Sequence, residues 1–368
     1  MENMKELFKQ KPGKAYRFII IFFAMFSALA APACKPGKIP VQEIEAREIL
    51  DLSNLEPKID DGDLGEYSCA FAMDETENLY FADSQQHCVL KFDIKGRFLN
   101  RIGHVGMEGD GLYYPWGLFI EKDKLYILDN RGRSLKIYDT AGNFVSWMKF
   151  SDAYWAETLC VDKGNIFLNI RYFDEKNYNQ QKLISVFSEK GKKKDAFGKI
   201  IRSHKFFGYS FFNTSYLTSV KNKIYGAFRF YPAVFCYDFT GREVYYHDLK
   251  NSKIEEIQRL NKEGIEGGMD MPGAIKTAEW GARAINYCSS FAVDREGRGY
   301  MSVDCYDQKS SRNTIICVDT AGIPQKKLKL TLHGKPVRRI DQLIITGKNK
   351  RCAIGNIEGS KRVYLFKF

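Results

Sequence analysis

The sequence has few of the residues on which catalytic and metal-binding sites most often depend. Only five histidines occur among its 368 residues, and none has a partner at the spacing of metal ligands. No two cysteines are separated by two residues, which excludes a zinc knuckle. Gly-x-Ser-x-Gly and His-Glu-x-x-His motifs are also missing, so the sequence carries no hydrolase or metalloprotease signature.

Long runs of one charge are missing as well. The net charge is +11, but the basic residues are spread along the chain without a block of five or six. This distribution predicts a solvated surface, and an anionic partner is the alternative. An export signal at the N-terminus argues against nucleic acid as that partner.

The apolar segment Phe18–Leu29 is shorter than the about 20 residues that a membrane span requires. It follows a basic segment that ends at Arg17, and small residues then lead to Ala33. This three-part pattern is typical of a secretory signal peptide. We therefore assign residues 1–33 to a signal peptide and exclude them from the fold.

Cys34 directly follows Ala31-Pro32-Ala33. This arrangement resembles the lipobox of bacterial lipoproteins, although Ala31 stands where that family prefers Leu. The resemblance implies that Cys34 is acylated and that residues 34–43 form a tether to a membrane of the bacterial cell envelope, facing the periplasm or the cell surface. Ordinary cleavage after Ala33, which would release a soluble protein, is the alternative.

The nine cysteines suggest a disulfide framework for an exported protein. Their positions favour another interpretation, because most lie inside apolar runs, where cysteine behaves as a small buried hydrophobic residue. We expect free buried thiols, with one or two disulfides between adjacent strands as the alternative. The residues concerned are Cys69, Cys88, Cys160, Cys236, Cys288, Cys317 and Cys352.

Five short signatures recur along the chain, each an aromatic residue or Val, usually an Asp, and a turn that ends in Gly. Their glycines are 46, 49, 50 and 81 residues apart, at Gly96, Gly142, Gly191, Gly241 and Gly322. A period of about 45–50 residues in a strand-rich chain is typical of β-propeller blades. The sequence therefore predicts an all-β, six-bladed propeller over residues 44–368.

The chain ends on the third predicted strand of the sixth blade, which leaves an edge without a partner. We expect the segment Val41–Leu52 to supply the fourth strand and to close the ring. An insertion at about residues 250–286 interrupts the repeat. It contains an amphipathic helix over residues 252–263, which Gly264 is expected to end.

The second repeat carries a more specific resemblance. Its residues Gly103 to Gly117, the strand Leu125-Tyr-Ile-Leu-Asp129 and the turn Tyr138-Asp-Thr-Ala-Gly142 resemble an NHL repeat. The region 44–368 also resembles the six-bladed β-propeller lipoproteins of Gram-negative bacteria. These resemblances imply the fold but no particular activity, and they imply no cofactor.

In a propeller, the loops that join second to third strands and the loops that join blades converge on one face. Here these loops are rich in aromatic residues and arginines, which suit the binding of a protein, peptide or glycan. The alternative is that many of the rings fill loop cores. The candidate ligand-binding residues are Trp116, Arg131, Arg133, Trp155, Arg171, Tyr172, Arg229, Tyr231, Trp280 and Tyr306.

The alternative function is a metal-dependent lyase or lactonase with its site at the central channel. Peptidyl-hydroxyglycine lyases share the NHL propeller and bind zinc through histidines, a resemblance that makes His87, His104 and His204 the candidate ligands. Calcium-dependent lactonases of six-bladed fold need Glu, Asn and Asp at the channel mouth. Glu157, Asn213 and Asp341 lie near suitable strand starts.

Overall fold

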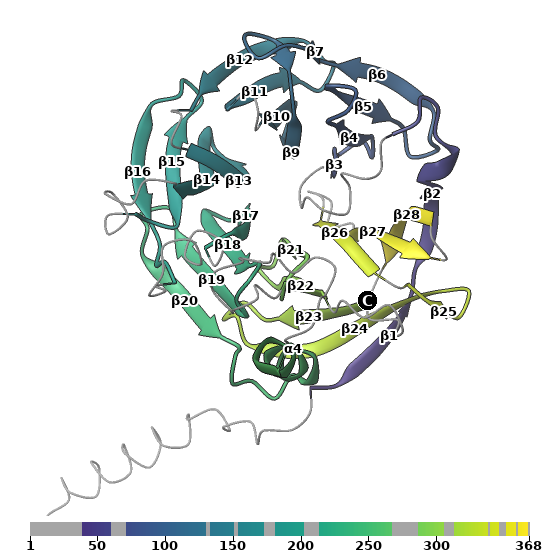
Figure 1. The fold of residues 1–368 in the computed structure, drawn as a ribbon, viewed down its shortest axis with the longest axis vertical. Coiled ribbons are helices and arrows are strands. Elements are labelled where there is room, and N and C mark those ends of the chain that lie inside the picture. Colours follow the sequence, from purple (N-terminus) through teal and green to yellow (C-terminus); the bar gives the residue numbers. More distant parts are fainter. Residues whose placement is uncertain are drawn as a thin grey trace, which may run out of the picture. The chain divides into compact units, whose positions relative to one another are not determined.

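Strands dominate the protein, and their sheets follow one another around a ring (Figure 1). The computed structural model describes residues 39–59, 71–129, 133–150, 154–172, 181–201, 213–266, 286–304, 313–337, 339–345, 351–357 and 360–366. The predicted signal peptide and Cys34 lie outside these ranges. From Ile39 onward the chain forms a single unit.

Four of the blades are four-stranded antiparallel sheets in which strands pair in chain order, from the centre of the ring to its rim. The first two blades consist of β3 (Phe71–Met73), β4 (Leu79–Asp83), β5 (Cys88–Phe92) and β6 (Phe98–Ile102), then β9 (Pro115–Glu121), β10 (Lys124–Asp129), β11 (Ser134–Asp139) and β12 (Phe144–Lys149). The next two consist of β13 (Tyr154–Asp162), β14 (Asn165–Tyr172), β15 (Ile184–Ser188) and β16 (Lys193–Phe197), then β17 (Ser215–Val220), β18 (Lys223–Phe228), β19 (Ala233–Asp238) and β20 (Glu243–Asp248).

The last two blades take strands from both ends of the chain. Blade five contains β21 (Ser290–Val293), β22 (Gly299–Asp304), β23 (Asn313–Val318) and β24 (Pro324–Leu332), with β25 (Lys335–Pro336) and β1 (Val41–Glu45) added to β24. Blade six contains β26 (Arg339–Ile345), β27 (Arg351–Ile357), β28 (Ser360–Phe366) and β2 (Arg47–Asp51). A short pair, β7 (His104–Val105) and β8 (Gly111–Leu112), lies between blades one and two. The prediction of a six-bladed propeller is thus confirmed.

The first strand of each blade contacts the first strand of the next, and β26 contacts β3. These contacts close the inner ring. The hydrophobic clusters lie between neighbouring blades rather than inside single sheets. One, for example, joins Ile137 of blade two to Leu168 of blade three. Burial between adjacent sheets therefore holds the ring together.

The N-terminal segment closes the ring, as predicted, but it serves two blades instead of one. β2 pairs antiparallel with β28 and completes blade six. β1 instead pairs parallel with β24 as an added outer strand of blade five, with Ile44 buried against that blade. Ala46 lies between the two strands and donates a backbone hydrogen bond to Thr331 O at 2.7 Å. The tether prediction for residues 34–43 therefore overlaps an ordered strand from Val41 onward.

The insertion after blade four contains a helix, as predicted. Helix α4 (Glu255–Glu266) buries Ile257 and Leu260 against blades four and five. Glu256 accepts a bond from Lys327 Nζ of β24 at 3.0 Å. The expectation that Gly264 ends the helix is wrong, because α4 continues to Glu266. Packing of the apolar face outweighs the modest cost of one glycine in a helix. No described helix is long and apolar enough to cross a membrane.

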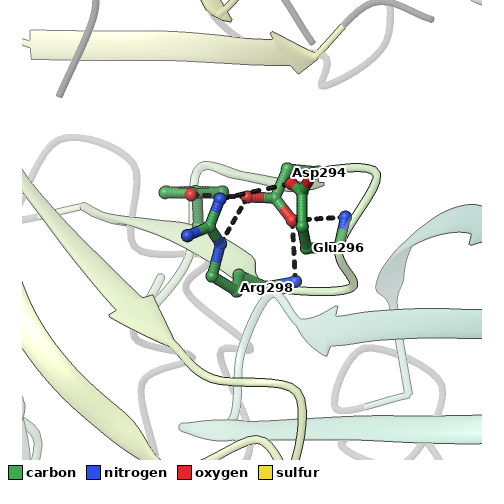
Figure 2. Close-up of polar contacts among 4 residues, drawn as sticks. Asp294, Glu296 and Arg298 are labelled. Carbon is green, nitrogen blue, oxygen red and sulfur yellow. Dashed lines mark hydrogen bonds and ion pairs between the residues drawn. The ribbon is translucent and has the colours of Figure 1, made fainter.

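The repeated aspartates organise turns. In the turns that start at Asp93, Asp238 and Asp319, the carboxylate accepts backbone hydrogen bonds from the residues two and four positions further on, at 2.9–3.0 Å. Asp294 does the same in blade five, where Glu296 N and Arg298 N donate to Oδ1 and Arg298 Nε donates to Oδ2 at 2.7 Å (Figure 2). The recurring Asp thus has a structural role in the hairpins.

Candidate functional site

The antiparallel meander gives each blade two distinct ends. We call the loop face the side with the connections between second and third strands and between blades, and the turn face the opposite side. The candidate residues that lie in the described part of the chain belong to the loop face or to strand ends next to it.

Buried polar side chains hold the long loop between blades one and two. Lys136 is fully buried in β11, and its Nζ donates to Gly109 O at 2.9 Å and to Met107 O at 3.1 Å. Burial lowers the pKa of the Lys136 ammonium. Asp129 at the end of β10 accepts bonds from Tyr113 N and Tyr114 N, at 3.0 and 2.7 Å.

The same loop crosses itself at two glycines. A Cβ on Gly111 would lie 2.6 Å from Gly106 Cα, so neither position can carry a side chain without a shift of the backbone. Next to this crossing, the ring of His87 stacks on Tyr113 at 5.3 Å, and His87 Nδ1 lies 2.6 Å from Tyr113 O. The glycine crossing and the contact with His87 thus both hold this loop in place. Tyr113 and Tyr114 directly precede β9.

Three inner strands have a β-bulge near their loop-face ends. The extra residue is Trp116 in β9, Glu157 in β13 and Asp341 in β26, because the pairing with the second strand skips each of them. Bulges redirect side chains and are common beside functional sites. Glu157 and Asp341 are nevertheless buried, at 3% and 6% exposure. The bulges therefore place an indole and two buried carboxylates at equivalent positions of three blades.

Polar side chains link the inner strands to one another. Trp116 Nε1 donates to Glu157 O at 3.3 Å, Thr158 Oγ1 to Ser215 O at 2.6 Å, and Gln342 Nε2 to Phe71 O at 2.7 Å. These bonds fix the inner strands relative to their neighbours. Gln342 Oε1 is buried and makes no hydrogen bond to a described residue. Because such an atom is costly to bury alone, it marks a position where a water or ligand donor fits.

Arg229 and Tyr231 lie in the connection between the second and third strands of blade four. Arg229 N donates to Thr214 O, and Arg229 O accepts from Tyr287 N, both at 2.8 Å. Its guanidinium lies 5.0 Å from the centre of the Phe230 ring. The Tyr231 hydroxyl donates to Asp248, and burial together with this bond raises the pKa of Tyr231. The backbone bonds of Arg229 thus join the loop-face ends of blades four and five.

Three other candidate residues lie in the first two strands of blade three. Trp155 belongs to β13 and pairs with Arg171 of β14, and Tyr172 ends that strand. Arg133 lies just before β11, exposed, with a φ of 45°. Arg131, Trp280, Tyr306 and the candidate metal ligand His204 lie outside the described residues.

The candidate metal ligands are not brought together within the described ranges. Among those residues, no group of three or more His, Cys, Asp or Glu side chains is arranged to hold a metal ion. His104 is exposed, with Nε2 3.9 Å from Asp110 Oδ1. Asn213 uses its amide on Ile201, accepting from Ile201 N at 2.7 Å and donating to Ile201 O at 3.0 Å. Both polar groups of the Asn213 side chain therefore bond to the backbone of Ile201.

Sequence reasoning missed the bulges and the role of Lys136. A bulge depends on how two strands register, which residue types do not encode directly. Lys136 gave a usable signal, however, because a lysine within the apolar run Leu135-Lys-Ile-Tyr138 is out of place unless its amine has buried acceptors.

The closed ring of six sheets, with one blade completed by a strand from the other end of the chain, defines a β-propeller. The model of the DUF5128 family, described as a 6-bladed beta-propeller, matches residues 71–277. This match spans more than half of the chain, which therefore belongs to that family. No curated protein matches the sequence.

Solved structures support the same fold. A Bacteroides fragilis protein named "Putative exported protein" is 13% identical, with a TM-score of 0.54 over 89% of this chain and 99% of its own. The Pan2 WD40 domain of Neurospora crassa is 9% identical, with a TM-score of 0.50 over 88% of this chain and 94% of its own. At these identities the similarity shows the fold alone.

Proposed function

We propose that this protein is an exported, lipid-anchored binding or scaffold module that takes a protein, peptide or glycan on its loop face. The observation that carries the proposal is the set of bulges at Trp116, Glu157 and Asp341. Three blades carry the same departure from regular pairing at the same end, although their residue types differ. Such a repeated departure suits recognition of a ligand better than it suits packing.

The chemistry of this face fits a polar ligand with flat or ring-shaped groups. The Tyr114 and Trp116 rings lie 6.0 Å apart, and Trp116 remains partly exposed beside them. Arg229 adds a cation with a planar array of donors, which suits carboxylate or sugar oxygens. No cofactor is needed for recognition of this kind.

Export and lipid anchoring are supported by the leader of the sequence. A basic segment, an apolar stretch and Ala31-Pro32-Ala33-Cys34 stand in the order that secretion and acylation require. The Bacteroides fragilis neighbour, whose name assigns it to export, has the same fold. The expected location is the bacterial cell envelope.

The test is a screen of the protein that begins at Lys35 against arrays of defined glycans and peptides. Trp116→Ala and Arg229→Ala should each weaken binding of a selected ligand at least about tenfold, the loss that corresponds to about 1.4 kcal/mol. Arg242→Ala, which removes an exposed arginine of the turn face, is the matched control. Equal binding by all variants with unchanged melting temperatures would contradict the proposal.

A second candidate is a metal-dependent lyase or lactonase. It is favoured by one observation, the placement of two buried carboxylates, Glu157 and Asp341, at equivalent bulges. Elemental analysis of protein purified without chelator or His-tag separates the candidates. Zinc or calcium bound in a stoichiometric amount, and absent from the Glu157→Gln variant, would favour the enzyme. Binding of a glycan or peptide by the metal-free protein would favour the binding module.

A further inference from the structure

Lysines occupy the same position in three successive hairpins of the turn face. Lys122, Lys163 and Lys221 each begin the two-residue turn between the first and second strands of blades two, three and four. All three are exposed. Their φ angles are 57°, 52° and 52°, in the left-handed region that Asn and Gly adopt with less strain than lysine. Hairpin geometry alone therefore does not account for the choice of lysine.

These hairpins form one continuous surface. Lys163 N donates to Glu121 Oε1 of blade two at 2.9 Å, and Lys163 Nζ donates to Asn222 Oδ1 of blade four at 2.6 Å. Lys194 Nζ donates to Asn165 Oδ1 at 2.6 Å. Because both amide partners are neutral, these contacts fix the ammonium groups without cancelling their charge.

We call this surface the lysine face and define it as residues 121–124, 162–165, 188–194 and 220–223. It contains nine lysines and four acidic residues. One of the acidic residues, Glu189, is already paired with Lys124 at 2.7 Å. The surface is thus strongly basic in a chain whose charge is otherwise dispersed.

We infer that the lysine face binds the anionic headgroups of a lipid bilayer. The ammonium groups are spread over the turns of three blades, an arrangement that suits an array of headgroups better than one small ligand. Only residues 35–38 separate Cys34 from the described chain at Ile39. If Cys34 is acylated as proposed, a linker of this length reaches at most about 17 Å and keeps the propeller at the membrane surface.

The direction of β1 agrees with this orientation. β1 runs parallel to β24 and begins beside Lys327, toward the end of β24 that follows the turn at Asp319–Ile323. The chain leading back to Cys34 therefore leaves from the turn end of blade five. With the lysine face on the bilayer, the loop face with Trp116 and Arg229 points away from the membrane and stays accessible to a ligand.

The test measures binding of the protein that begins at Lys35 to vesicles of phosphatidylcholine with 30% phosphatidylglycerol, by co-sedimentation at low salt. The unmodified protein should bind these vesicles and not pure phosphatidylcholine, and added salt should weaken binding. The variant Lys122→Asn/Lys163→Asn/Lys221→Asn should bind about 100-fold more weakly, because each lysine near an anionic surface contributes about fivefold to the affinity. Its melting temperature should stay the same or rise, because asparagine relieves backbone strain in these turns.

The matched control is Lys58→Asn/Lys182→Asn/Lys250→Asn, which removes three exposed lysines from loop-face connections. It should bind the vesicles as the unmodified protein does. The proposal is overturned by absence of binding to the anionic vesicles, by an equal loss in both triple variants, or by full binding of the turn-face variant. Binding to heparin without binding to vesicles would assign the face to an acidic polymer instead. None of these outcomes depends on the loop-face ligand.

Discussion

At the scale of single residues, the turn aspartates are the clearest case of one side chain fixing a local structure. Asp294 is fully buried and accepts bonds from two backbone N–H groups and the Arg298 guanidinium (Figure 2). It also accepts a bond from the Tyr300 hydroxyl. Burial alone would raise the pKa of this carboxyl, but the bonds from Arg298 and Tyr300 outweigh it and lower the pKa. The turn therefore stabilises the ionised form.

Replacing Asp294 with Asn should lower the free energy of unfolding by about 2–3 kcal/mol, because charge-assisted bonds are lost in a buried position. Since the folded-state pKa is depressed, the contribution is present above the unfolded value of about 4 and is lost as the pH falls below it. Denaturant unfolding between pH 7 and pH 3 should thus show a smaller loss of stability in the variant than in the original protein. Glu296→Gln, at a side chain that is 54% exposed, is the control, and an equal effect there would contradict the assignment.

At the scale of elements, the N-terminal segment contributes one strand to each of two neighbouring blades. β1 buries Ile44 and adds an edge to a sheet that already has its own four antiparallel strands. β2 supplies the fourth strand of blade six and buries Leu50. Arg362 of β28 reinforces this pairing through Glu48, at 2.6 Å. β2 is therefore essential to ring closure, whereas β1 is an addition.

A chain that begins at Ala46 should fold and lose about 3 kcal/mol, the cost of removing one buried isoleucine contact. A chain that begins at Leu52 should lose cooperative unfolding, because blade six would keep three strands and an open edge. Thermal unfolding, monitored by circular dichroism, distinguishes the two truncated chains. The control is Val41→Asp, at a side chain that is 50% exposed, which should leave the melting temperature unchanged. A similar loss of stability in both truncated chains would contradict the different roles of β1 and β2.

The sequence predicted the blades because their information is local. Each Asp-to-Gly turn is complete within five residues, as Asp238 to Arg242 shows, so its spacing reports the repeat directly. The placement of β1 is not local, since its partner β24 lies at the far end of the chain. The same holds for Glu157 and Asp341, whose bulges arise from strand register. The sequence placed these two residues near strand starts but could not predict their conformation.

At the scale of the whole molecule, the core is distributed over the interfaces between blades. The cysteines Cys88, Cys160, Cys236, Cys288 and Cys317 are buried thiols in these interfaces, and none forms a disulfide. The prediction from their apolar surroundings is confirmed for these five thiols, whereas Cys69 and the side chain of Cys352 lie outside the described part of the structure. Burial raises the pKa of the Cys88 thiol to about 11 and that of Cys236 to about 12. The reactive thiolate is therefore scarce at neutral pH.

Alkylation of these thiols should report the unfolding of the ring as one unit. At pH 8 the native protein should react with iodoacetamide at least about 100-fold more slowly than the unfolded protein, as expected for buried thiols with raised pKa values. Mass spectrometry should show one shared rate for Cys88 of blade one, Cys160 of blade three and Cys236 of blade four. Separate rates for separate blades would instead mean that the blades open individually.

The closing contact between Glu48 and Arg362 joins residues that are 314 positions apart. A ribosome completes β2 long before it reaches β28, the strand with which β2 pairs. Until then β28 does not exist, and β2 has no partner strand. Contacts of such long range slow folding, and the ring cannot close before β28 has been made.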